Sequence, residues 1–273
     1  MAEPLVLPST RLLPQDPVTA VETLASEGYT RIELNYASFE RAGYDHPSYP
    51  NMLRRSLLEA ARRGVEVPVV HAPWEDYFLL ALGRGVEAAV AEALTLAEIA
   101  DSYGVEVMVF HPFSAKRVGS GRVEWINRKF FALLSERADD EGLSIAFAVE
   151  NTSREKPWSR VEVVASLVSR VSHPRLRLCV DFGHALLNSY QPGEALRAAS
   201  GLEACLHVHD NHGEKDEHLV PGAGSARWLT LRGRRPAARY AVVEVDCREH
   251  IEHCLARLRV AVAATEAVLS LAR

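Results

Sequence analysis

The sequence predicts a single domain with the (β/α)8 barrel fold over residues 1–273. Short apolar runs alternate with longer amphipathic segments along the whole chain, which is typical of a parallel sheet whose strands are connected by helices. Eight such runs occur, and the length of 273 residues is close to the roughly 250 of a typical barrel. The first run, LVLPS, is not followed by a glycine-rich turn, which argues against an open doubly wound sheet.

The strand candidates are short runs rich in Val, Ile and Leu, as expected for strands that are buried on both faces. They are LVLPS (5–9), RIELNY (31–36), VPVVHAP (67–73), EVMVFHP (106–112), SIAFAVEN (144–151), LRLCVDFGHA (176–185), CLHVHDN (205–211) and YAVVEVD (240–246).

The segments between these strands have helical periodicity. In PVTAVETLASEG (17–28), Val18, Val21 and Leu24 are three residues apart, and Gly28 is a suitable stop signal. Similar patterns predict helices over 51–64, 86–104, 121–142, 160–171, 194–201 and 248–273. The segment SARWLTLRG (225–233) has only a weak pattern at the position of the seventh helix.

Composition and charge narrow the class of protein. The net charge of −5 provides no overall positive surface for nucleic acid, although it does not exclude a local basic groove. None of the four cysteines forms a C-x-x-C pair, so a structural zinc ribbon is not expected, and this usage is typical of a reducing compartment such as the cytoplasm. The N-terminus lacks a secretory pattern, and no apolar run is long enough to span a membrane.

Reactive side chains lie at the ends of most predicted strands, and in a barrel these C-terminal ends form the active site. They are Glu33, His71, His111, Glu150, Asp181, His184, His207, His209, Asp210 and Glu244. Glu150 and Glu244 directly follow apolar runs, where a carboxylate is costly to bury unless it is paired or bound to a metal. Carboxylate and imidazole ligands suit Mn²⁺, Mg²⁺, Co²⁺ or Zn²⁺. The sequence therefore predicts a divalent metal site at the mouth of the barrel.

The densest part of this set is LHVHDNHGEKDEHLVPGAG (206–224). Alternate residues of a strand share a face, so His207 and His209 point the same way and are too crowded to both ligate one ion. The residues expected to be solvated in the turn that follows are His212, Glu214 and Lys215. Asp216 and His218 lie in a loop that could fold over the mouth, and there they either close over a substrate or hold an additional metal.

With these residues the sequence resembles the xylose isomerase-like TIM barrel superfamily. That group contains sugar and sugar-phosphate isomerases and epimerases, and also zinc-dependent apurinic/apyrimidinic endonucleases. The order and spacing of several short motifs over nearly the whole chain carry the resemblance. The motifs are IEL (32–34), HAP (71–73), HP (111–112), VEN (149–151), VDFGHA (180–185), HVHDN (207–211), DEHLVPGAG (216–224) and VEVD (243–246).

The isomerases and epimerases of the group imply one divalent ion held by residues that match Glu150, Asp181, His207 and Glu244. In these enzymes the two glutamates also serve as the catalytic acid/base pair. His184 matches the histidine that contacts substrate oxygens. We then expect Glu33, His209 and Asp210 to hydrogen-bond to the ligands without contacting the ion.

The endonucleases of the group imply three zinc ions, with nucleic acid as the partner. The positions that match their additional ligands are His71, His111, His184, Asp216 and His218. The aromatic residues that could stack on bases lie in the segment 35–52 and are Tyr36, Phe39, Tyr44 and Tyr49, although packing of a long loop explains them equally well.

The function expected from the sequence is a divalent-metal-dependent sugar or sugar-phosphate isomerase or epimerase, which transfers protons through an enediolate with Glu150 and Glu244 as acid and base. Glu33 in RIEL and the residue pattern of the 206–224 stretch favour the isomerase or epimerase over the alternative, the zinc-dependent endonuclease. The density of acids disfavours a barrel that only binds sugar. Lys116 and Arg117 are candidates for holding a substrate phosphate. A small-molecule sugar is the expected partner, no membrane is involved, and a homo-oligomeric state stays open.

Overall fold

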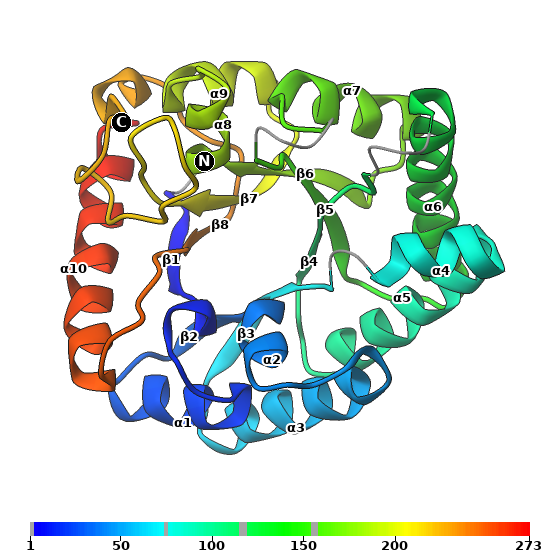
Figure 1. Ribbon diagram of the computed structural model, residues 1–273, viewed down its shortest axis with the longest axis horizontal. Coiled ribbons are helices and arrows are strands. Elements are labelled where there is room, and N and C mark those ends of the chain that lie inside the picture. The colour runs from blue at the N-terminus through cyan, green and yellow to red at the C-terminus, as the bar shows by residue number, and fades with distance from the viewer. Residues whose placement is uncertain (1–2, 74–75, 115–118, 154–157) are drawn as a thin grey trace.

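The computed structural model describes residues 3–73, 76–114, 119–153 and 158–273. The expected phosphate contacts at Lys116 and Arg117 lie outside the described residues. Eight parallel strands form a ring that is surrounded by helices, so the predicted barrel is confirmed (Figure 1). The strands are β1 (Leu5–Pro8), β2 (Arg31–Leu34), β3 (Glu66–His71), β4 (Val107–Phe110), β5 (Ala146–Glu150), β6 (Leu176–Asp181), β7 (Glu203–Val208) and β8 (Tyr240–Val243).

The strand order is β1-β8-β7-β6-β5-β4-β3-β2, so each strand lies beside its neighbours in the sequence and β8 returns to β1. β1 and β2 are the two ends of this order, and an isolated parallel bridge between Ser9 and Glu33 connects them. The register places Asp181 beside His207 on β6 and β7. Neighbouring strands thus bring their reactive C-terminal residues to one end of the barrel.

Helices connect the strands on the outside of the ring. They are α1 (Pro17–Ser26), α2 (Tyr36–Arg41), α3 (Tyr49–Arg62), α4 (Asp76–Arg84), α5 (Val86–Asp101), α6 (Ser120–Asp140), α7 (Val161–Val171), α8 (Phe182–Leu187), α9 (Pro192–Ala199) and α10 (Ile251–Ser270), with short 3-10 helices η1 (Thr10–Leu12), η2 (His46–Ser48) and η3 (Trp228–Leu231). Their starts follow ordinary capping rules: Asp16 accepts hydrogen bonds from the N–H groups of Val18 and Thr19, and Pro17 occupies the first turn of α1. Among the described helices, none is long and apolar enough to cross a membrane.

All eight strands end earlier than predicted, and in two of them the cause is a residue that caps a helix. Asn35 accepts from the N–H of Ala37 and caps α2, so the second strand ends at Leu34. Asp181 accepts from the N–H of His184 and caps α8, so the sixth strand does not extend to residue 185. The weak seventh helix is only the 3-10 turn η3.

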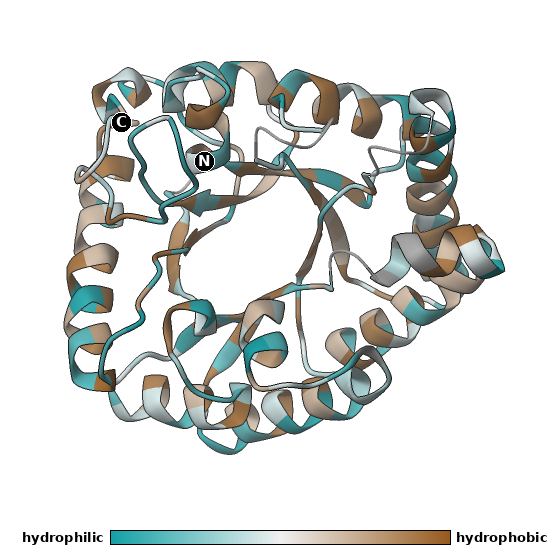
Figure 2. Cartoon of the chain, viewed as in Figure 1, coloured by the Kyte–Doolittle hydropathy of each residue, from teal (hydrophilic) through white to brown (hydrophobic). Residues whose placement is uncertain are grey.

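Two apolar layers position the site. One lies between the sheet and the helices, which carry alternating apolar and polar bands (Figure 2). The other fills the barrel interior beneath the reactive residues and consists of Leu7, Val69, Val107, Val109, Ala148, Cys179, Cys205, Tyr240 and Val242. Cys179 and Cys205 are buried free thiols, as expected. Cys247 and Cys254 form a disulfide, which corrects the expectation of a purely reduced set of cysteines.

Candidate metal centre

Four side chains from four strands converge on one point at the mouth of the barrel. His207 on β7 is fully buried, and its Nδ1 lies 3.3 Å from Oε2 of Glu150, 3.6 Å from Oε1 of Glu244 and 3.8 Å from Oδ2 of Asp181. Glu150 and Asp181 are the last residues of β5 and β6, and Glu244 directly follows β8. The structure thus brings together the residues predicted to hold the central ion.

This group fits a divalent cation. Nδ1 of His207 makes no hydrogen bond although it is buried, so its lone pair has no other use in the described part of the chain. Separations of 3.3–3.8 Å are those of donors arranged around one ion with bonds of about 2.0–2.2 Å. Three buried carboxylates also need a compensating positive charge. Carboxylates with one imidazole are ligands that suit the divalent ions named above.

The same carboxylates determine the charge states around the site. Burial would raise the pKa of Glu150, but the charges of His111 and His207 hold it well below its ordinary value. Burial likewise opposes ionisation of Glu244, yet His207 and Arg11 lower its pKa to about 2. Burial would lower the pKa of His207, but the negative charges of Glu244 and Glu150 outweigh burial and hold that pKa well above its ordinary value. A cation and a proton therefore compete for the same place.

On one side of the centre lie His71, which ends β3, and His111, which follows β4. The Nε2 atoms of the two rings are 3.1 and 3.2 Å from Oε2 of Glu150. Nδ1 of His71 donates to the carbonyl oxygen of Ala72 at 2.8 Å, because a carbonyl can only accept, and Nε2 therefore faces Glu150. These three residues form a second group with the donor spacing of a metal site.

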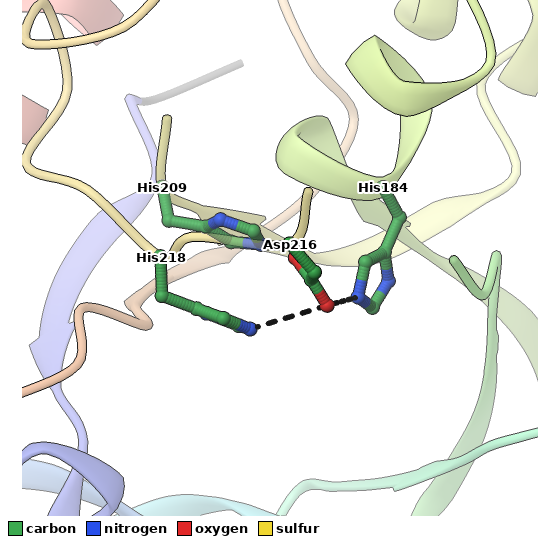
Figure 3. A group of neighbouring side chains, drawn as sticks. All are labelled: His184, His209, Asp216 and His218. Carbon is green, nitrogen blue, oxygen red and sulfur yellow. Dashed lines mark hydrogen bonds and ion pairs between the residues drawn. The ribbon is translucent and has the colours of Figure 1, made fainter. Parts of the chain in front are cut away.

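On the other side lies a third group, shown in Figure 3. Oδ2 of Asp216 is 3.0 Å from Nε2 of His184 and 3.5 Å from Nε2 of His218. The rings of His209 and His218 stack with their centroids 3.9 Å apart. Nε2 of His209 lies 3.0 Å from Oδ1 of Asp181, which links this group to the central one.

The loop that carries Asp216 and His218 is organised by Asp210. It is the hydrophilic loop between β7 and β8 (Figure 2). The carboxylate of Asp210 accepts four hydrogen bonds, from the N–H groups of Asn211 (2.8 Å), Gly222 (2.9 Å) and Ala226 (3.1 Å) and from Nε1 of Trp228 (3.1 Å). Its backbone pairs with that of Leu219. Asp210 thus holds the loop rather than the central ligands.

The turn at the outer end of this loop is solvated, as predicted. His212, Glu214 and Lys215 are exposed. His212 pairs with Glu217, at 2.9 Å.

Asn35 was not among the predicted site residues. Its Oδ1 accepts from the N–H of Ala37 at the start of α2, so its amide nitrogen faces the opposite way. Nδ2 donates to Oε1 of Glu33 at 3.1 Å and to Oε1 of Glu244 at 2.8 Å. Burial and then the charge of Glu244 raise the pKa of Glu33 to about 7. The signal in the sequence was an Asn directly after the apolar run RIEL.

Arg11 was also missed. It lies in η1, directly after β1, and Nη2 donates to Nε2 of His218 at 3.0 Å while Nε donates to Oδ1 of Asp246 at 3.3 Å. A single basic residue at the C-terminal end of the first strand was the available signal.

Two thiols lie near the centre. Cys179 and Cys205 are partners in the register of β6 and β7, and their sulfur atoms and a ring nitrogen of His207 lie within 4.8 Å of one another. The ligand set was expected to lack thiolate, and the cysteines belong to the apolar layer inside the barrel.

Comparisons with known proteins agree with this architecture. The chain is 26% identical over 226 residues to the uncharacterized protein MJ1311 of Methanocaldococcus jannaschii, covering 80% of this chain and 74% of that protein. A D-tagatose 3-epimerase-like protein has a similar structure, with a TM-score of 0.75, 20% identity and coverage of 98% and 97% of the two chains. The IOLI protein with a bound zinc atom superposes with a TM-score of 0.76, 18% identity and 98% coverage of both chains.

D-psicose 3-epimerase from Clostridium cellulolyticum H10, solved with D-tagatose, has a TM-score of 0.73 at 15% identity, with 98% of this chain and 99% of that chain covered. At these identities the solved structures share the fold with this chain. A model of the family described as xylose isomerase-like TIM barrel matches residues 21–249. The chain therefore belongs to the xylose isomerase-like TIM barrel family.

Proposed function

We propose that the protein is a divalent-metal-dependent isomerase or epimerase that acts on a sugar or sugar phosphate. The observation that carries this proposal is the position of Glu150 and Glu244, which approach Nδ1 of His207 from β5 and β8. Two strands, β6 and β7, separate β5 from β8 around the ring. The two carboxylates therefore reach a molecule at the mouth from different sides.

This arrangement suits proton transfer next to a carbonyl group. One carboxylate must remove a proton from carbon, and an acid must return a proton to the same carbon on the other face or to its neighbour. The pKa values of Glu150 and Glu244 both lie below their ordinary values, because the charges of His111 and His207 act on Glu150 and those of His207 and Arg11 act on Glu244. Both are ionised at neutral pH, so either can begin the reaction as a base. The carboxyl that takes up the proton can return it to the neighbouring atom, as isomerisation requires. Return to the other face of the same carbon requires that the opposite carboxylate first takes a proton from solvent.

A divalent ion held by Glu150, Asp181, His207 and Glu244 would stabilise the negative charge that develops on the substrate oxygens. The chain's own contribution is orientation. Asn35 holds one oxygen of Glu244, at 2.8 Å. Nδ1 of His184 lies 2.9 Å from the carbonyl oxygen of Asn151, which leaves Nε2 directed to the mouth beside Asp216.

The solved structures named above supply the suggested class of substrate. Two of them are, by name, a ketose 3-epimerase and a protein similar to one. Transfer of that substrate class to this chain is part of the proposal, and it rests on the central group of side chains.

The alternative is a zinc-dependent endonuclease for abasic DNA, and the two outer groups around Glu150 and Asp216 favour it because they match additional ligand positions. The aromatic residues proposed to stack on bases do not support it. Tyr36, Phe39 and Tyr49 are buried and pack against one another with edge-on rings, the centroids of Tyr49 being 5.1 Å from Tyr36 and 4.7 Å from Phe39. Tyr44 packs against the same core.

The test is solvent exchange into a substrate. The purified protein is incubated in D2O with D-tagatose, D-psicose, L-ribulose and phosphorylated ketoses, with Mn²⁺, Co²⁺, Mg²⁺ or Zn²⁺ added in turn, and the sugars are analysed by mass spectrometry. We expect incorporation of deuterium at carbon with at least one sugar and metal, and none after chelation. Absence of exchange across the panel, together with cleavage of a duplex that contains an abasic site, would overturn the proposal.

A further inference from the structure

The ring of His218 is fully occupied by protein partners. Nδ1 lies 2.7 Å from the carbonyl oxygen of Glu244, and because a carbonyl can only accept, Nδ1 carries the hydrogen. Nε2 of the neutral ring is then an acceptor, and Nη2 of Arg11 donates to it at 3.0 Å. His218 is 4% exposed, so no water is needed to satisfy it. Its lone pair, which a metal would need, is already used.

Arg11 is held in this position from several directions. Its backbone N–H donates to Oγ of Ser9 at 3.0 Å, and its Nε donates to Oδ1 of Asp246 at 3.3 Å. Arg41 donates to the carbonyl oxygens of Arg11 and of Leu13. Only 20% of the Arg11 side chain is exposed. The Arg11 guanidinium is therefore held in a fixed position in the site, unlike a mobile side chain on the surface.

We infer that Arg11 takes the place of a third cation beside Asp216 and His218, and so limits the protein to the central ion and the one that His71 and His111 could hold. This inference rests on the proposed function and adds to it which positions of the site a metal ion can occupy. It also separates this chain from a three-metal nuclease, because one of the three positions is taken by a side chain.

Geometry and charge both exclude a metal there while Arg11 stays in place. A metal bound to Nε2 of His218 would lie about 2.0–2.1 Å away along the lone pair that Arg11 uses, which is on the order of 1 Å from its Nη2. Arginine also keeps its charge at any pH at which the protein is folded. The guanidinium of Arg11 also interacts electrostatically with the carboxylates of Glu244, Asp246 and Asp216, so a positive charge is already present at this position.

The inference predicts a change in metal content that does not depend on turnover. Wild-type protein, Arg11→Met and Arg11→Lys are stripped with a chelator, dialysed to equilibrium against Zn²⁺, and analysed for zinc and protein. Arg31→Met is the matched control, because Arg31 starts β2 at the opposite end of the barrel and is 45% exposed. We expect Arg11→Met to bind one more Zn²⁺ per chain than wild type. Arg11→Lys and Arg31→Met should match wild type.

A second variant locates the additional ion. His218→Ala introduced into Arg11→Met should return the zinc content to that of the wild type. Binding of a third Zn²⁺ by the wild type, or an unchanged zinc content in a folded Arg11→Met variant, would overturn the inference. Should Arg11→Met fail to fold, zinc-edge anomalous diffraction from zinc-soaked wild-type crystals decides: a peak at bonding distance from Nε2 of His218 overturns the inference, and peaks confined to the other two groups support it.

These outcomes are separable from failure of the proposed function. Zinc content that behaves as expected without deuterium exchange would remove the isomerase and leave the role of Arg11 intact. Deuterium exchange with a third zinc in the wild type would do the reverse.

Discussion

Asn35 donates a hydrogen bond of 2.8 Å from Nδ2 to Oε1 of Glu244. Because Oδ1 of the same amide caps α2, the Asn35 side chain cannot turn over without losing both contacts. The orientation of the Glu244 carboxylate is thus fixed by the start of α2. Glu244 follows β8 and α2 follows β2, so this contact crosses the junction between β1 and β2, which we call the seam of the barrel. A carboxylate held in one orientation before substrate arrives has less freedom to lose during reaction.

Glu244→Gln should therefore remove activity and leave the fold intact. Glutamine keeps the size of the side chain and an oxygen that accepts from Asn35, but it cannot take up a proton from carbon. Loss of a general acid/base lowers the rate by about 10²–10⁴-fold or more. Exchange rates and circular dichroism would be measured together. Glu66→Gln, at the opposite end of the barrel and 65% exposed, is the control. Full activity in Glu244→Gln would exclude Glu244 from the mechanism.

Removal of the proposed divalent ion should lower thermal stability. An ion present at about 1,000 times its dissociation constant stabilises the folded state by about 4 kcal/mol. At roughly 2–4 °C per kcal/mol, a protein of this size should lose on the order of 10 °C in Tm after chelation. Differential scanning calorimetry would measure it.

Asp181→Asn provides the comparison for that experiment. Its side-chain oxygen can still cap α8 by accepting from His184, while the negative charge of the ligand is lost. We expect its Tm to change little on chelation. A Tm drop equal to that of the wild type would show that the stabilising ion binds elsewhere.

Glu33 should make the stability of the metal-free protein depend on pH. Burial, reinforced by Glu244, raises the pKa of Glu33 to about 7, above the 4.5 of an ordinary glutamate. The folded state then binds the proton more tightly than the unfolded state. The stability from Glu33 is fully present below about pH 4.5 and is lost as the pH rises through about 7.

The measurement is urea unfolding of chelator-treated wild type and Glu33→Gln between about pH 5 and about pH 8. Glutamine stays neutral, so the wild type should lose stability relative to the variant as the pH rises. Two curves that run parallel over this range would show that Glu33 does not titrate there.

Gly183→Ala should disturb the site through His209. A Cβ atom at Gly183 would lie 1.9 Å from Cε1 of His209, whose ring is fully buried between α8 and the loop after β7. Overpacking of this kind costs about 1–3 kcal/mol. We expect lower stability in urea and weaker metal binding, because His209 contacts Asp181. Gly83→Ala, which has open space around the new Cβ, is the control, and an equal effect in both variants would contradict the argument.

Much of the architecture could be predicted because the relevant signals are local. The alternation of apolar runs and helical patterns identified all eight strands, and the last residues of those strands marked the mouth. The boundaries at Asn35 and Asp181 were wrong because each side chain hydrogen-bonds to a backbone N–H two or three residues ahead and starts a helix. An apolar run does not reveal that its final residue is a cap.

The missed site residues are those whose partners are distant in the sequence. Arg11 and Asp246 are far apart along the chain and meet because β1 lies beside β8. A closed barrel predicts that neighbourhood, but not which side chains reach across it. Cys247 and Cys254 are only seven residues apart, and they pair because the chain turns from β8 into α10 between them.

The seam of the barrel gives the site an uneven mobility. β1 and β2 are joined by the isolated bridge between Ser9 and Glu33 instead of a continuous ladder. Local opening requires the least free energy where backbone hydrogen bonds are fewest, so amide hydrogens along this seam should exchange earliest among the strands. Asn35 directly follows β2 and Arg11 lies three residues after β1, whereas the four central side chains lie on or directly after β5 to β8, which are joined by continuous ladders. Local opening between β1 and β2 would therefore move the Arg11 guanidinium and the Asn35 amide, while the four central side chains keep their positions.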